Sequence, residues 1–304
     1  MTKTIELAIS TCPNDTFAFH GLLTGQVDSR GLDFRVELHD VQELNRALFE
    51  GRYDCAKASF HAGLLLSHEL VVFSSGSALG FGVGPLLLAA ADYDASRVSH
   101  PAVLCPGEHT TATMLYKLFY PGVGDIRQVV FSEIMPALQQ GTADLGVCIH
   151  EGRFTWQRQG LQRVADLGTL WEERTNTPLP LGGIVGRRAL GNETLAKIQA
   201  VIHDSVRYGL QHRAETLPTM KRYAQELEEE VIYAHVDLYV NDWTVALGEV
   251  GQQALDRLHT LALAAGMVPE GQEKLEIITG EPASAASSKT DQSVHKTANL
   301  PRHS

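Results

Sequence analysis

The stretch ALFEGRYD at residues 47–54 recurs 90 residues later as ALQQGTAD at residues 137–144, with four of the eight positions identical. A second matching pair lies upstream of these copies, TCPNDT at residues 11–16 and LCPGEHT at residues 104–110. Each copy is typical of a strand, a Cys-Pro turn, a helix, a strand, a helix, a Gly-x-x-Asp segment and a final strand. The repetition predicts two similar α/β lobes with a small-molecule cleft between them.

The alternation of strands and helices predicts mixed, mostly parallel sheets joined by right-handed crossovers. We expect a discontinuous lobe 1, residues 1–97 and 185–279, and a lobe 2 of residues 98–184. An apolar strand predicted over residues 85–90 is assigned to the sheet of lobe 1. Large apolar side chains are almost absent after Gly280, so residues 280–304 are predicted to form a disordered tail.

The composition is that of an ordinary globular protein, with 44% hydrophobic and 20% charged residues. A net charge of −11 argues against nucleic acid or an anionic membrane surface as the main partner, because both require concentrated Lys and Arg. An anionic small ligand stays possible, since backbone dipoles act locally. We expect a cytoplasmic protein, because the amino terminus resembles no signal peptide and no segment is apolar enough to enter a membrane stably.

Four cysteines occur in or beside apolar strands, and none forms a C-x-x-C pair; they are Cys12, Cys55, Cys105 and Cys148. This pattern favours buried, reduced thiols over a disulfide framework or a zinc site. No H-E-x-x-H motif is present, and no G-x-G-x-x-G follows the first strand. Metal and nucleotide binding are therefore poorly supported by the sequence.

Active sites of open α/β sheets lie beyond the carboxyl ends of the strands. Applied to both copies, this rule selects residues 14–16, 57–59, 108–111 and 149–151. The polar residues 14–16 follow a proline and are typical of a helix-capping turn.

His150 follows the apolar run at residues 145–149 and so stands where a general base would be placed. An imidazole titrates near neutrality and can accept a proton at physiological pH. Spacing alone favours a histidine that is merely hydrogen-bonded at a strand terminus. The 90-residue offset places Phe60 opposite His150, so the two lobes present different groups at matched positions.

Three other candidates have a structural alternative. Lys57 is either an edge residue reaching solvent or a cationic ligand contact, and the sequence leaves both open. Ser59 is more typical of a capping hydroxyl than of a nucleophile, because no G-x-S-x-G elbow surrounds it. The helix start at Thr110 suits a carboxylate or phosphate through its free amides, although taken alone it favours plain N-capping.

Several longer motifs occur in order along the chain, and together they resemble a known family. They are STCPNDTF at 10–17, KAS at 57–59, GFGVGP at 80–85, PGEHTTA at 106–112, IHEGRF at 149–154, WEERT at 171–175, AHV at 234–236 and YVN at 239–241. These motifs look like those of the 1,4-dihydroxy-6-naphthoate synthases of the futalosine route to menaquinone. The resemblance covers nearly the whole chain short of the tail.

The resemblance implies a type II periplasmic-binding-protein fold and a carbon–carbon lyase. Cyclic dehypoxanthinyl futalosine, an anionic aromatic molecule, would be split into 1,4-dihydroxy-6-naphthoate and a three-carbon sugar fragment. The family needs no metal or organic cofactor, and its proton acceptor matches His150. Its ligand contacts fall on Lys57, Ala58, Ser59, Thr110, Thr111 and Ala112.

Two rival functions are weighed against this one. The first is a non-catalytic solute-binding protein of the same fold, which is disfavoured because import receptors carry export signals. The second is the sister chorismate dehydratase of the same pathway, which fold alone does not separate from the synthase. The Cys-Pro-Asn-Asp-Thr and Ile-His-Glu segments favour the synthase. A homodimer is left open by the sequence.

Overall fold

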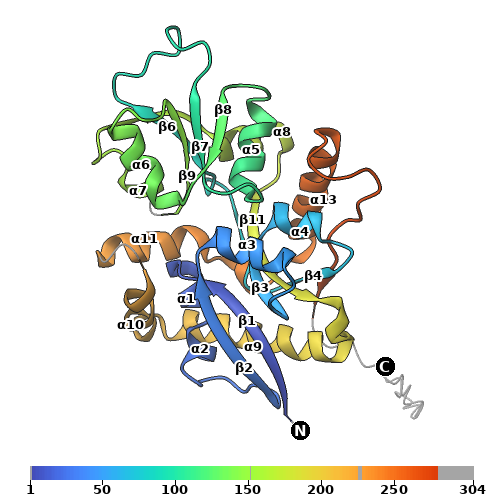
Figure 1. Ribbon diagram of the computed structural model, residues 1–304. Coiled ribbons are helices and arrows are strands. Elements are labelled where there is room, and N and C mark those ends of the chain that lie inside the picture. Colours follow the sequence, from blue (N-terminus) through green and yellow to red (C-terminus); the bar gives the residue numbers. More distant parts are fainter. Residues whose placement is uncertain (1, 151, 225–227, 280–304) are drawn as a thin grey trace, which may run out of the picture.

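The computed structural model describes residues 2–150, 152–224 and 228–279, and its strands form two separate sheets (Figure 1). The architecture is mixed α/β with two lobes, in agreement with the fold class expected from the repeat. The tail predicted over residues 280–304 lies outside the described residues.

The larger sheet has the order β12-β4-β11-β3-β1-β2, with β5 paired to β11. Its strands are β1 (Lys3–Ser10), β2 (Leu32–His39), β3 (Cys55–Ser59), β4 (Leu70–Phe73), β5 (Ala78–Gly80), β11 (Leu179–Arg187) and β12 (Ile277–Ile278). Strands β1, β2 and β3 are parallel, whereas β11 is antiparallel to β3. Both ends of the described chain thus contribute to this sheet.

The smaller sheet has the order β10-β6-β9-β7-β8 and uses only residues 86–166. Its strands are β6 (Leu86–Ala90), β7 (Ala102–Cys105), β8 (Asp125–Gln128), β9 (Leu145–Cys148) and β10 (Leu161–Asp166). The assignment of residues 85–90 to the first sheet is therefore wrong, because β6 pairs with β9 and β10. The chain crosses between the sheets before Leu86. The lobe boundaries expected at residues 97/98 and 184/185 stay a prediction.

The two sheets repeat one arrangement. The order β2-β1-β3-β11 in the first corresponds to β8-β7-β9-β6 in the second, and the last strand of each set is antiparallel to its neighbour. Leu7 pairs with Cys55 in one sheet, and Val103 pairs with Leu145 in the other.

The repeated Gly-x-x-Asp segment performs the same task in each lobe. Gly51 and Gly141 adopt left-handed backbone angles, φ 72° and 67°, which end the preceding helix at no steric cost. Three residues later, the carboxylate of Asp54 accepts a hydrogen bond from the Glu6 amide, at 3.0 Å. Asp144 accepts from the Ala102 amide in the same way, at 2.7 Å. Asp54 thereby ties the start of β3 to β1, and Asp144 ties the start of β9 to β7.

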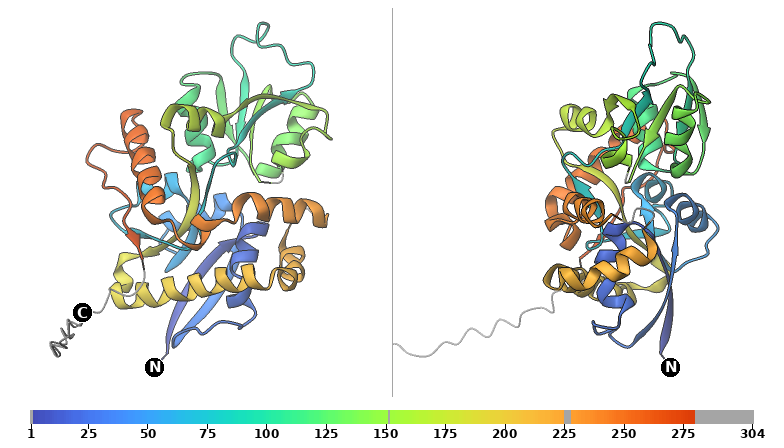
Figure 2. Two further views of the ribbon diagram at one scale, coloured as in Figure 1. Left: turned by 180° about the vertical axis from the view of Figure 1, so that it is seen from behind. Right: turned by 90° about the vertical axis from the view of Figure 1, so that its left-hand side faces the viewer.

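Helices cover the sheets and fill the space between the lobes (Figures 1 and 2). They are α1 (Pro13–Ala18), α2 (His20–Leu23), α3 (Val41–Phe49), α4 (Phe60–Leu65), α5 (Thr111–Phe119), α6 (Phe131–Gln139), α7 (Gly152–Thr155), α8 (Leu167–Thr175), α9 (Asn192–Gln211), α10 (Arg213–Tyr223), α11 (Glu229–Tyr239), α12 (Asp242–Val245) and α13 (Gly248–Ala264), with a short 3-10 turn at Arg188–Leu190. Helix α11, orange in Figure 1, runs along the side of lobe 1 that faces lobe 2.

The four cysteines are buried, and within the described ranges they form no disulfide, as the sequence predicts. The described helices include none with the length and apolarity needed to cross a bilayer. Within the same residues, no three His, Cys, Asp or Glu side chains gather as a metal site would require.

Candidate functional site

One pocket lies where β1, β3, β7 and β9 end, between the two sheets. It encloses about 100 Å³, well above the ~15 Å³ that a single water occupies. The structure brings all seven sequence-predicted residues to its wall: Lys57, Ala58, Ser59, Thr110, Thr111, Ala112 and His150. Their roles stay predictions, but their convergence from both copies of the repeat is a fact of the fold.

The wall of this pocket is mainly apolar. Val41, Ala78, Val83, Ile149 and Leu181 contribute aliphatic surface. A mainly apolar wall with a few polar groups is the usual character of a small-molecule site.

In lobe 1, the turn after β1 carries a buried ion pair. Pro13 occupies the first turn of α1, where the missing amide hydrogen is not needed. Asp15 and Lys57 are 1% and 7% exposed, and the Lys57 ammonium lies 2.6 Å from the Asp15 carboxylate. Lys57 also donates to the carbonyl of Gly76, at 3.3 Å. A buried pair of this kind is stable only while both partners are present.

These contacts settle two questions that the sequence leaves open. Lys57 is not an edge residue, because β3 lies between β1 and β11. The polar residues 14–16 do not cap α1 through a side chain, since Cys12 is the N-cap residue and makes no such bond. The capping interpretation of this turn is therefore wrong.

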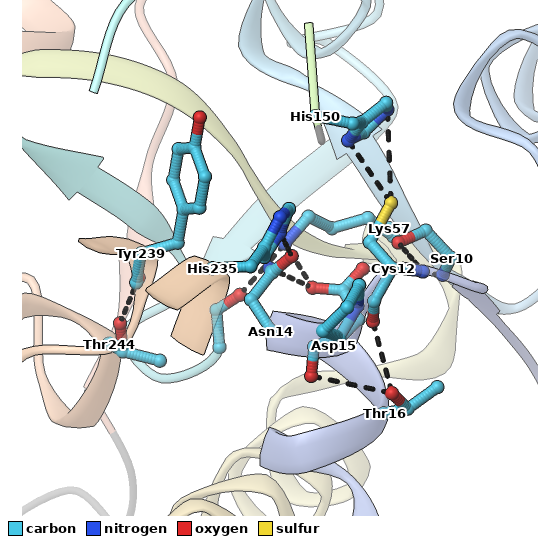
Figure 3. A network of polar contacts seen from close by, with 12 residues as sticks. Ser10, Cys12, Asn14, Asp15, Thr16, Lys57, His150, His235, Tyr239 and Thr244 are labelled. Carbon is cyan, nitrogen blue, oxygen red and sulfur yellow. Dashed lines mark hydrogen bonds and ion pairs between the residues drawn. The ribbon is translucent and has the colours of Figure 1, made fainter. Parts of the chain in front are cut away.

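Asn14 links this turn to helix α11. Its amide nitrogen donates to Asp15 Oδ1 at 2.8 Å, and its amide oxygen lies 2.9 Å from His235 Nε2 (Figure 3). His235 is 1% exposed and lines the same pocket. Burial lowers the pKa of His235 well below its ordinary value, and the nearby His150 and Lys57 lower it further. The ring is therefore neutral at physiological pH.

In lobe 2, His150 stands in a backbone conformation that few residues adopt. Its φ of 55° lies in the left-handed region, which few non-glycine residues adopt, and strained backbone of this kind clusters at functional sites. Burial lowers the pKa of His150 to about 4; the Asp15 carboxylate opposes this shift and the Lys57 ammonium adds to it. His150 is thus an unprotonated base at neutral pH.

His150 is positioned by contacts from both lobes. Its Nδ1 lies 3.1 Å from the Cys12 sulfur of lobe 1, as Figure 3 shows. The ring also meets the edge of Phe131, at 4.7 Å between centroids. The near-parallel ring of His235 is 6.4 Å away. Two neutral imidazoles therefore face one pocket at close range.

The start of α5 forms the lobe 2 side of the pocket. Thr110 is the N-cap residue and accepts from the Thr113 amide at 3.1 Å, so the predicted capping is present. The Thr111 hydroxyl donates to the Leu181 carbonyl of β11 at 2.7 Å, which anchors the helix start to the strand between the lobes. The first amides of a helix lack partners within it and carry the positive end of its dipole. This end of α5 suits an anionic group.

Ser59 is held by a neighbour and does not act as a cap. Its hydroxyl accepts from the Asn45 side-chain amide at 3.0 Å, and its backbone amide donates to the Asn45 oxygen at 2.9 Å. Ser59 makes no side-chain capping bond to α4, so the capping interpretation is wrong.

Arg153 pairs with Asp166 at 2.8 Å and donates to the Gly84 carbonyl, so its guanidinium is engaged away from His150.

Sequence reasoning did not single out His235 or Cys12 as site residues, and it selected Asn14 only as part of a turn interpreted as a helix cap. His235 carries a weak signal, because it lies on the buried face of α11 with Ile232, Val236 and Tyr239, where apolar residues are expected. Its partner Asn14 is 221 positions away in the sequence. Spacing cannot predict a contact of that separation.

Comparisons with known proteins agree with this geometry. Residues 5–264 match the model of a family described as menaquinone biosynthesis. A Thermus thermophilus protein named 1,4-dihydroxy-6-naphthoate synthase is 43% identical over 87% of this chain and 96% of its own length. A Streptomyces coelicolor protein of the same name is 38% identical, over 88% of this chain and 95% of its own.

Solved structures show the same architecture. A protein of Archaeoglobus fulgidus superposes with a TM-score of 0.82 at 29% identity, over 87% of this chain and 98% of that one. The periplasmic aliphatic sulphonate binding protein of Escherichia coli superposes with a TM-score of 0.59 at 15% identity, over 99% of both chains. The second likeness concerns the fold alone, which is that of the periplasmic binding proteins.

Proposed function

We propose that this chain, which belongs to the menaquinone biosynthesis family, is a 1,4-dihydroxy-6-naphthoate synthase that acts as a carbon–carbon lyase. Its substrate would be cyclic dehypoxanthinyl futalosine, and its products 1,4-dihydroxy-6-naphthoate and a three-carbon sugar fragment. The observation that carries the proposal is His150, a neutral base in a rare backbone conformation at the pocket. The names of the two relatives supply the product, and the resemblance of the motifs to those of the synthases implies the substrate and the three-carbon fragment.

The pocket accounts for binding of an anionic aromatic molecule. The first amides of α5, capped by Thr110, suit the substrate carboxylate. Lys57, which is paired with Asp15, lines the pocket from the opposite lobe and could donate to a polar group of the substrate. Aliphatic side chains such as Val41 and Leu181 offer surface to the rings. The carboxylate and the rings would therefore contact both lobes at once.

The chemistry begins with proton removal by His150. A base with a pKa of about 4 holds no proton at neutral pH and is ready to accept one. The C–H bonding pair forms a new double bond, a C–O bond of the sugar remnant breaks, and the oxygen keeps that pair and takes up the proton from His150, which becomes neutral again. The subsequent carbon–carbon cleavage is favoured because it completes an aromatic ring. Closure of the two lobes would exclude water from these steps.

The proposal is tested by incubating the purified, chelator-treated protein with cyclic dehypoxanthinyl futalosine and following the products by mass spectrometry. We expect 1,4-dihydroxy-6-naphthoate from the wild type and none from His150→Ala. Binding of the product to His150→Ala, measured by calorimetry, reports whether the pocket is intact. Turnover of chorismate in place of the cyclic substrate would identify the sister dehydratase. A cytoplasmic location and a homodimer also stay predictions.

A further inference from the structure

His235 is a second imidazole of the pocket whose protonation is set by its neighbours. The carboxylate of Asp15 only accepts hydrogen bonds, so the Asn14 amide must turn its NH2 group toward Asp15. The Asn14 oxygen therefore faces His235, and an amide oxygen also only accepts. It follows that His235 Nε2 carries the hydrogen and donates it.

The tautomer leaves a lone pair on the other ring nitrogen. In a neutral imidazole with hydrogen on Nε2, Nδ1 is an acceptor. In the part of the chain that the structure describes, His235 Nδ1 is buried and has no hydrogen-bond partner. A buried polar atom left unsatisfied destabilises the protein. A ligand hydroxyl that met this nitrogen would relieve that destabilisation.

The arrangement that fixes the tautomer is itself firmly held. Asp15 accepts from Asn14 at 2.8 Å, from Lys57 at 2.6 Å and from the Ser10 amide at 3.3 Å. Figure 3 shows the contacts that run from Lys57 through Asp15 and Asn14 to His235. Rotation of the Asn14 amide would place two acceptors against each other at Asp15 and two donors against each other at His235.

We propose that His235 is a second proton acceptor of the reaction, which receives a substrate hydroxyl proton on Nδ1 after His150 has removed the first proton. The inference rests on the function proposed above. It assigns the two transfers to two histidines whose ring centroids lie 6.4 Å apart, one following β9 and one on α11.

The second step balances without a further reactant. A three-carbon sugar is a carbonyl compound, so its release converts a hydroxyl of the substrate into C=O. The hydroxyl proton moves to His235 Nδ1, and the O–H pair becomes the C=O π bond. The carbon–carbon bond breaks, its electron pair enters the ring that becomes aromatic, and the carbonyl oxygen of that ring takes up the proton from His235. Both imidazoles are neutral again at the end.

Substitution of His235 tests the step, with two matched controls. His235→Gln keeps a polar group near the Nε2 position but cannot accept a proton. His150→Gln removes the first acceptor. His61→Gln is the control for burial, because His61 is also a buried histidine with an unpartnered Nδ1 and a pKa lowered by burial to about 4, yet it does not line the pocket.

We expect His235→Gln to lower kcat by about 10²–10⁴-fold, the usual contribution of a positioned acid or base. Its dissociation constant for 1,4-dihydroxy-6-naphthoate should stay within threefold of the wild-type value. The variant should accumulate an isomer of the substrate that still carries the three-carbon fragment, visible by chromatography and mass spectrometry. His150→Gln should leave the substrate unchanged, and His61→Gln should keep the wild-type kcat.

Three results would overturn the inference: a kcat of His235→Gln within threefold of wild type, product binding weakened by the same factor as kcat, or a stalled reaction in which only unchanged substrate remains. An independent measurement is ¹⁵N NMR of labelled histidine, which should find His235 protonated on Nε2 only; hydrogen on Nδ1 would contradict the mechanism. Wild-type protein that forms no product would instead contradict the proposed function, and this inference with it.

Discussion

The two Cys-Pro turns occupy equivalent places in the two sheets but lead to different side-chain interactions. After β1, the turn leads to the buried Asp15, which is paired with the lysine of β3. After β7, the turn leads to the neutral hydroxyl of Thr110, which caps α5. The position equivalent to Lys57, 90 residues later, is Val147. One copy thus contains a buried charge network, and the other presents a helix terminus that is capped by Thr110.

The two turns contribute different interactions to the pocket. A helix terminus binds an anion with fixed backbone dipoles and needs no counter-ion. A buried ion pair costs desolvation but orients the groups hydrogen-bonded to it, here Asn14 and through it His235. The duplicated fold supplies two similar frames: the lobe 1 turn orients His235 through Asn14, and lobe 2 presents the start of α5 together with His150.

The largest expected effect follows from breaking the charge network of lobe 1. Lys57→Met leaves Asp15 buried without its counter-charge, so the free energy of unfolding should fall by about 3–5 kcal/mol. Urea denaturation followed by circular dichroism measures the loss. The double variant with Asp15→Asn should be more stable than Lys57→Met alone. A Lys57→Met protein as stable as wild type would show that the pair is solvated and that the two turns do not differ as described.

A smaller effect concerns the pH dependence of activity. An ordinary histidine base, with a pKa near 6.5, would be about 3% unprotonated at pH 5. His150, with a pKa of about 4, should be about 90% unprotonated there, roughly a 30-fold difference. Since only the neutral ring accepts a proton, kcat/KM should be maintained as the pH falls to 5 and should decline through about pH 4. An acid limb centred near pH 6.5 would mean that His150 is solvated in the free enzyme.

The sequence predicts the duplicated frame but not every strand. Repeats such as Gly51 and Gly141 encode turns that depend only on neighbouring residues, so they are visible in the sequence. Strand β6 is a continuous apolar run, LLLAA, and has no alternation that would indicate which sheet it joins. Its place depends on long-range pairing with β9 and β10.

The candidate site, like the fold, was predictable from the sequence only in part. The seven predicted residues follow strand ends or begin a helix, where the rule for α/β folds applies locally. The partnership of Asn14 with His235 arises only when α11 packs on α1, so no spacing within the sequence reveals it. The ion pair of Lys57 likewise joins residues 42 positions apart.

The smallest expected effect on stability concerns the N-cap of α5 in lobe 2. Thr110→Val removes the N-cap of α5 and should lower the free energy of unfolding by about 1 kcal/mol, less than the loss at Lys57. The same denaturation assay measures it. A destabilisation equal to that of Lys57→Met would show that the two turns contribute equally to stability, which contradicts the difference between them.

The central claim is that one pocket between two specialised lobes performs a carbon–carbon cleavage with His150 as the first base. Its most direct test is the stoichiometry of a chelator-treated reaction, quantified by mass spectrometry with isotope-labelled standards. The account predicts one 1,4-dihydroxy-6-naphthoate and one three-carbon fragment for each cyclic dehypoxanthinyl futalosine consumed, and no consumption by His150→Ala. Consumption without release of the fragment, or equal turnover by wild type and His150→Ala, would contradict it.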